Sequence, residues 1–256
     1  MPLRRSWLVW CLLCLGCQSL ALPEGENADP EAERPLGYYD QDVARDSGVT
    51  SSPLSLAAEA IRQGDEAAAC RHLACYLTDH PGHFEVRVHY ADLLLHQDRR
   101  EEARAEFVRC IAQAQERGQR TLRERIHCHG RLLDMAETED DEYGMHLHRG
   151  LGLYLLAIER AELGDGEDGP LPVQAILCRA AGELTTARTL KPGASQPSWY
   201  LYKVWSALGQ PAAAERWLRR TREIAAFDPL TPAEQRELQL ALRAAPTTSS
   251  TTLARR

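Results

Sequence analysis

Three of the eight cysteines lie within eleven residues near the start of the chain, in the stretch LVWCLLCLGCQ at positions 8–18. Thiolates bind metals, form disulfides and act as nucleophiles, so the spacing invites a chemical reading. The surroundings favour another one. Two arginines precede an apolar run of nine residues, Trp7–Leu15, and the small residue Gly16 follows it. This order is typical of a secretory signal, and nine residues are too few to span a bilayer. The sequence therefore predicts that these cysteines belong to a targeting segment.

Four histidines form two closely spaced pairs, His127 with His129 and His146 with His148. Imidazole is a ligand for zinc and copper. Residues two apart on a helix point roughly 200° apart, however, so neither pair can hold one ion by itself. A site would need one histidine from each helix to meet across the hairpin. We therefore expect packed or surface histidines and no bound metal, and a metal- or haem-handling protein built on residues 127–148 is the alternative.

Motifs of common enzymes do not occur in the sequence. It contains no His-Glu-x-x-His, Gly-x-Ser-x-Gly or Walker-type loop, and Gly150-x-Gly152 has Leu155 where a dinucleotide loop needs a third glycine. The formal net charge of −7 argues against nucleic acid as a partner. We expect a protein that is not an enzyme and has no cofactor, with an enzyme of unrecognised, scattered site as a second alternative.

The segment Cys14-Leu15-Gly16-Cys17 resembles the signal box of bacterial lipoproteins. The resemblance implies that residues 1–16 are removed and that Cys17 carries the lipid as the new N-terminus. One departure is Cys14, because the family prefers leucine at that place. The resemblance also implies a lipid-anchored protein of the bacterial cell envelope that faces the periplasm, with the outer membrane favoured over the inner one.

The rest of the chain divides by composition into three parts. Residues 17–52 are rich in Pro, Glu, Asp, Gly and Ser and are predicted to form a disordered acidic tether. Residues 246–256 are predicted to be a disordered tail. Between them, residues 53–245 show helical periodicity almost throughout, and strand-forming residues are scarce. The sequence therefore predicts an all-α domain.

A spacing of 34 residues recurs within that domain. Each time, a small alanine is followed one helical turn later by a large apolar residue, which lets two helices approach closely while the larger side chain fills the groove between them. The pairs are Ala69 with Leu73, Ala103 with Phe107, Ala180 with Leu184, and Ala214 with Leu218.

These segments resemble tetratricopeptide repeats over residues 53–117 and 173–229, and Pro81 and Pro192 match the proline that ends such repeats. Neither segment has the full Trp-x-x-Leu-Gly-x-x-Tyr start of the family. The resemblance implies an α-solenoid of antiparallel helix pairs. It also implies a protein-binding function, as an adaptor or assembly factor that docks a protein or peptide partner along its concave face.

The middle of the chain does not keep the repeat spacing. Ala103 and Ala180 are 77 residues apart, which is two repeats plus nine residues. From Leu147 to Ile158 one apolar stripe continues across Gly150 and Gly152, which favours a single helix over residues 141–163. A break into two helices at these glycines is the alternative. We expect an irregular middle section.

The resemblance also implies where a partner binds, since the first helix of each pair lines the concave surface in this family. The residues of these helices that are not needed for packing form the predicted partner-binding groove: Arg87, His89, Trp199, Tyr202 and Lys203. The alternative for the aromatic members is that they cap the end of the solenoid against the helix after Pro232.

Overall fold

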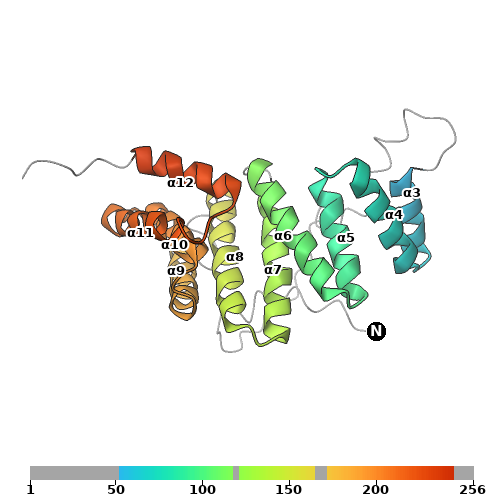
Figure 1. Ribbon diagram of the computed structural model, residues 1–256, viewed down its shortest axis with the longest axis horizontal. Coiled ribbons are helices and arrows are strands. Elements are labelled where there is room, and N and C mark those ends of the chain that lie inside the picture. The colour runs from blue at the N-terminus through green and yellow to red at the C-terminus, as the bar shows by residue number, and fades with distance from the viewer. Residues whose placement is uncertain (1–51, 118–120, 165–171, 245–256) are drawn as a thin grey trace, which may run out of the picture.

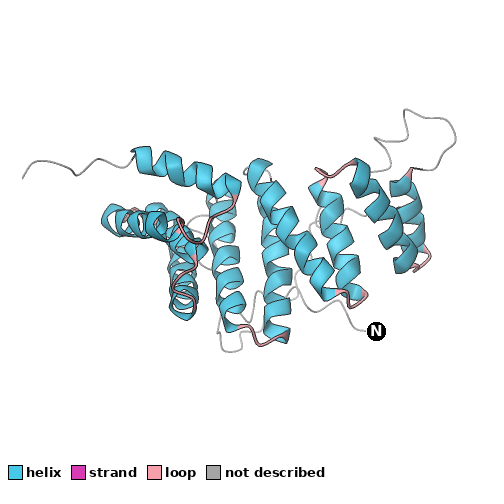
Figure 2. Ribbon diagram, viewed as in Figure 1, coloured by secondary structure: helices cyan, strands magenta, loops and turns pink. Residues whose placement is uncertain are grey.

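A computed structural model describes residues 52–117, 121–164 and 172–244 (Figure 1). The predicted signal peptide, nearly all of the tether, and the tail lie outside the described residues. Every regular element in the described part is an α-helix, as Figure 2 shows, which confirms the all-α prediction. The helices are α3 (Pro53–Arg62), α4 (Glu66–Asp79), α5 (Phe84–His96), α6 (Arg100–Arg117), α7 (Leu122–Thr138), α8 (Glu142–Leu163), α9 (Val173–Leu190), α10 (Ser195–Ala207), α11 (Pro211–Ile224) and α12 (Pro232–Ala244). No helix among them is long and apolar enough to cross a membrane.

Polar side chains cap the starts of three of these helices. The side chains of Ser52, Asp65 and Asp141 accept hydrogen bonds from backbone N–H groups in the first turns of α3, α4 and α8. Such caps satisfy donors that have no partner within the helix. Helix α8 ends at Gly164, which has φ +78°, a conformation that costs glycine little and other residues more.

The predicted repeat contacts are buried as expected. The four alanine–large residue pairs are between 0% and 5% exposed, and each lies on the second helix of an antiparallel pair. The pairs are α3 with α4, α5 with α6, α8 with α9, and α10 with α11. In Figure 1 the helices from α3 to α8 stand in one row, as in a solenoid.

The middle section contains one helix, α7, that stands outside the four repeat pairs. Helix α8 runs without a break from Glu142 to Leu163, which confirms the single-helix prediction. Because α8 packs mainly on α9, helix α7 is left as an extra helix between α6 and α8. An odd helix shifts the alternation of first and second helices, so the repeats before it and after it are out of phase.

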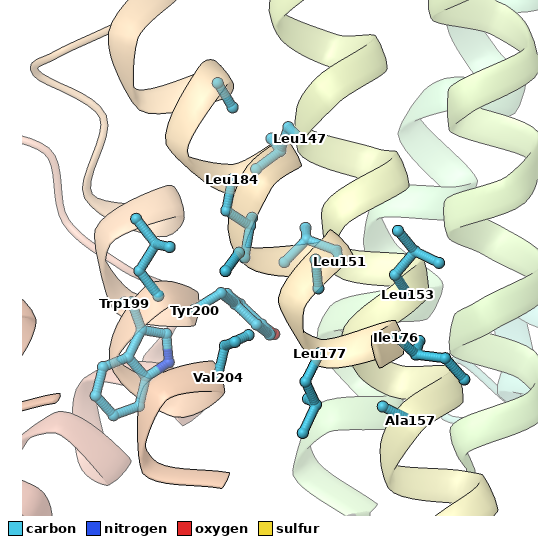
Figure 3. Close-up of a cluster of buried hydrophobic side chains, with 14 of the residues drawn as sticks. Leu147, Leu151, Leu153, Ala157, Ile176, Leu177, Leu184, Trp199, Tyr200 and Val204 are labelled. Carbon is cyan, nitrogen blue, oxygen red and sulfur yellow. The ribbon is translucent and has the colours of Figure 1, made fainter. Parts of the chain in front are cut away.

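The apolar side chains buried in the described part form three main clusters along the chain. The first joins α3, α4 and α5, the second joins α4 to α7, and the third joins α8 to α12. Figure 3 shows the third, in which Tyr200 and Val204 of α10 lie close to Leu177 of α9. Helices α7 and α8 meet along a seam between the second and third clusters.

Candidate functional site

The predicted groove residues of α10 lie in two different environments. Trp199 is 1% exposed and belongs to the third core cluster, so the expectation that it faces a partner is wrong. The reason is the crowding of α10, which contacts α8, α9 and α11. Tyr202 is half-buried and stacks on Trp199 with ring centroids 5.1 Å apart. The Nζ atom of Lys203 lies 5.1 Å from the Trp199 ring centroid and 2.5 Å from Glu237.

Arg87, predicted as a groove residue on α5, is also buried, at 7% exposed. Its Nη1 donates to Glu106 at 2.5 Å, its Nε to Gln113 at 3.2 Å, and its Nη2 to the backbone carbonyl of Pro81 at 2.7 Å. The guanidinium therefore joins α5 to α6 and to the preceding turn, and it is not available to a partner. The sequence alone predicted an exposed arginine here, because it does not show that acceptors on α6 and in the preceding turn surround the side chain.

His89 lies half-buried beside a charged cluster that connects α5 with α7. Asp92 of α5 lies 2.9 Å from Nε2 of His127 and accepts a hydrogen bond of 2.8 Å from Arg131. Burial alone would raise the pKa of Asp92, but these two partners outweigh it and lower the pKa. Burial lowers the pKa of His89. The cluster is a charged contact between helices.

Two of the four candidate metal ligands do meet across the α7–α8 hairpin. The Nδ1 atoms of His129 and His148 are 3.2 Å apart, so one ring donates a proton and the other accepts it. His127 and His146 lie apart from this pair, against Asp92 and Glu183 respectively. Within the residues that the structure describes, no three side chains of ligand type gather around one point. The histidines therefore serve as two carboxylate partners and one buried pair.

A cavity lined by both polar and apolar side chains lies among α6, α7, α8, α10 and α12. Its volume is about 180 Å³, and Lys203 is the one predicted groove residue among those that line it. It is lined by Gln115, Leu122, Arg125, Tyr154, Leu155, Ile158, Tyr200, Lys203, Glu234 and Glu237.

Hydrogen bonds at the start of α12 close one side of this cavity. Thr231 and Glu234 form a reciprocal cap, in which the Glu234 carboxylate accepts from the Thr231 backbone N–H at 3.2 Å. The same carboxylate accepts from Gln115 of α6 at 3.1 Å, and Gln115 also donates to the Tyr200 hydroxyl at 3.3 Å. Arg236 of α12 also forms an ion pair with Glu116 of α6. These contacts hold the first turns of α12 against α6, more than 110 residues earlier in the chain.

A second concavity lies between the end of α11 and α12. It is open, about 800 Å³ in volume, and its walls are mainly apolar. Leu240 is 63% exposed there, while Leu238 beside it is buried. Arg222 and Arg243 are exposed at its edges and form no ion pair within the described residues. We call this concavity the α11–α12 cleft.

Sequence patterns could have indicated part of this arrangement. Thr231-Pro-Ala-Glu234 is a capping box with proline at the first helical position, so the start of α12 was readable. Nothing in the sequence indicates that Arg125 and Tyr200 meet, because they lie 75 residues apart in an irregular part of the repeat array.

The arrangement of stacked antiparallel helix pairs defines the class of protein as an α-solenoid. Residues 60–126 match the family model of the tetratricopeptide repeat. The match covers the end of α3, all of α4, α5 and α6, and the start of α7, and it supports a tetratricopeptide repeat protein. A comparison with curated proteins finds no match.

Proposed function

We propose that this chain is a protein-binding adaptor or assembly factor, held at a bacterial cell-envelope membrane by a lipid on Cys17 and facing the periplasm. The observation that carries the proposal is the stack of helix pairs, part of which matches the tetratricopeptide repeat model. Repeats of this kind build extended surfaces that suit protein partners. The anchor rests on the sequence Cys14-Leu15-Gly16-Cys17 and the preceding apolar run.

The α11–α12 cleft supplies the best docking surface for that partner. Its apolar walls and the exposed Leu240 favour an apolar ligand face, and the unpaired Arg222 and Arg243 favour negative charge at the edges of that face. The occupant that fits both features is an amphipathic segment of a partner protein that carries acidic residues beside its apolar side chains.

Site-specific crosslinking tests the docking surface. A photoreactive amino acid at position 240 is expected to capture a partner in native membranes. The same residue at position 108, where Val108 is 53% exposed on α6, serves as the matched control. The captured protein is identified by mass spectrometry, purified and titrated with the full chain.

Charge reversal then tests the partner chemistry. Arg222→Glu with Arg243→Glu is expected to weaken the affinity about tenfold or more, since two charge contacts at an interface are lost and reversed. Arg71→Glu, an exposed arginine on α4, is the control and should leave the affinity unchanged. Two outcomes would contradict this docking site: equal capture of the partner from positions 240 and 108, or an affinity that the double charge reversal leaves unchanged.

A further inference from the structure

The cavity beneath α12 contains a buried arginine that forms no ion pair within the described residues. Arg125 of α7 is 9% exposed, and no carboxylate of the described residues lies within ion-pair distance of it. Its Nη2 donates to the Tyr200 hydroxyl at a long 3.3 Å, and its Nε is buried without a hydrogen-bond partner. A guanidinium removed from water in this way costs free energy until an acceptor reaches it.

The two acidic residues of the cavity form hydrogen bonds or ion pairs with residues other than Arg125. Glu234 accepts from Thr231 and Gln115, and Glu237 pairs with Lys203 at 2.5 Å. Burial, and then the nearby Glu234, raise the pKa of Tyr200, so its hydroxyl stays neutral and offers Arg125 only a neutral acceptor. Neither carboxylate reaches the Arg125 guanidinium, so its free Nε–H is open to an acceptor that enters the cavity.

The shape and charge of the cavity restrict what that acceptor can be. The planar guanidinium fork matches a carboxylate, which can accept from two N–H groups side by side. A dianion such as phosphate would be repelled by the neighbouring Glu234 and Glu237 more strongly than a monoanion would. Leu122, Leu155 and Ile158 line part of the wall and favour an apolar portion in the ligand. The volume of about 180 Å³ is close to that of the roughly 150 Å³ cavity that admits benzene in another protein.

We propose that this cavity is a binding site for a small monocarboxylate with a short apolar body. The carboxylate sits on Arg125 and the apolar body lies toward Ile158. The site is independent of the α11–α12 cleft and of the proposed adaptor function, although α12 forms a wall of both.

Calorimetric titration of the purified full-length chain with defined probes tests the site. Benzoate and isovalerate carry the proposed chemistry, benzyl alcohol lacks the charge, and inorganic phosphate carries the charge without the apolar body. We expect benzoate and isovalerate to bind, with benzyl alcohol and phosphate weaker by about tenfold or more, because a charge-assisted hydrogen bond contributes roughly 1.5–3 kcal/mol.

Two variants and one control separate binding from folding. Arg125→Lys keeps the positive charge but loses the two parallel N–H donors of the guanidinium, and it should weaken the affinity for benzoate about tenfold. Arg123→Lys, two residues away with its side chain 73% exposed, should change nothing. Ile158→Phe fills the apolar end and should abolish benzoate binding while circular dichroism stays unchanged, which keeps the test valid if Arg125→Lys fails to fold.

Three results would overturn the proposal. The first is no binding of either monocarboxylate at about 10 mM, where even an affinity of roughly −4 kcal/mol would be detected. The second is phosphate binding as tightly as benzoate. The third is benzoate binding that survives both Arg125→Lys and Ile158→Phe.

Discussion

At the residue scale, the aromatic and arginine side chains that seem best suited to bind a partner are instead buried in the folded protein. Trp199 fills the third cluster with its ring, while Tyr202 on the same helix covers that ring from the outside. Large aromatic side chains bury more area than any others, so a packed position outweighs exposure at a groove.

Replacing Trp199 measures this directly. Trp199→Ala is expected to lower the free energy of unfolding by about 3–5 kcal/mol, since it removes apolar contacts and leaves a cavity. Tyr202→Ala should cost clearly less, because its side chain is only half-buried. Urea unfolding followed by circular dichroism checks both values, and equal losses for the two variants would place Tyr202 in the core as well.

The buried pair of His129 and His148 makes stability depend on pH. Burial lowers the pKa of His148 to about 4, with Asp141 opposing and Arg104 adding to the effect. Burial, His148 and Arg125 lower the pKa of His129 well below its usual range. The folded state thus binds fewer protons than the unfolded state below the unfolded pKa of about 6.5, so stability falls as pH drops from there toward 4.

Between pH 7 and pH 5, His148 alone should lower the free energy of unfolding by about 2 kcal/mol. His129→Leu with His148→Leu should reduce the measured loss by at least that amount, although His89 still contributes in the same window because burial also lowers its pKa. The exposed His80→Gln is the control. Urea unfolding at the two pH values is the measurement, and a loss unchanged in the double variant would show that this pair does not control it.

At the element scale, the close contact of α8 with α9 depends on a glycine inside a helix. A Cβ atom placed on Gly150 would lie 2.8 Å from Cγ of Leu184 and 3.3 Å from Cβ of Glu183. Glycine in a helix ordinarily costs about 1 kcal/mol relative to alanine, so its presence here reflects the need for space.

Gly150→Ala should therefore destabilise the protein by about 1–3 kcal/mol through overpacking, in spite of the better helix propensity. Gly182→Ala, at a position of α9 where nothing lies within 4 Å of an added Cβ, should stabilise it by roughly 0.5–1 kcal/mol. Melting curves of the two variants give opposite signs if α8 and α9 touch as described. A stabilising Gly150→Ala would require a wider spacing of these helices.

At the scale of the whole molecule, the extra helix α7 divides the solenoid into two stretches of different phase, and α12 closes the second one by reaching back to α6. Membrane attachment of the proposed kind rests on Cys17 near the start of the chain.

Cys17→Ser tests that attachment. Stable anchoring of a protein takes two lipid signals, and the family's usual product carries three acyl chains, so losing all of them should release the protein from membranes. Fractionation of cells is expected to move it from the membrane to the soluble fraction, and its signal peptide should remain uncleaved. An unmodified Cys17 in the native protein, seen by mass spectrometry, would end the lipoprotein interpretation.

The sequence by itself determined the helices and their pairing. Caps, turns and the 34-residue spacing are local, and an alanine followed by a large apolar residue one turn later, as at Ala103 and Phe107, packs in the same way wherever a neighbouring helix is available. The continuous stripe from Leu147 to Ile158 was also enough to predict one helix, because an apolar face that does not slip needs no break.

Only the tertiary structure decided which polar and aromatic residues stay accessible. Arg87 and Trp199 look alike in sequence to residues of an open groove, yet neighbours from other helices cover them. Arg125 became a candidate ligand site because α10 and α12 enclose it without placing a carboxylate within ion-pair distance of it. The accessibility of a side chain depends on contacts between helices far apart in the chain, and the extra helix α7 changes which helix faces meet. No local sequence pattern could therefore have predicted which side chains are accessible.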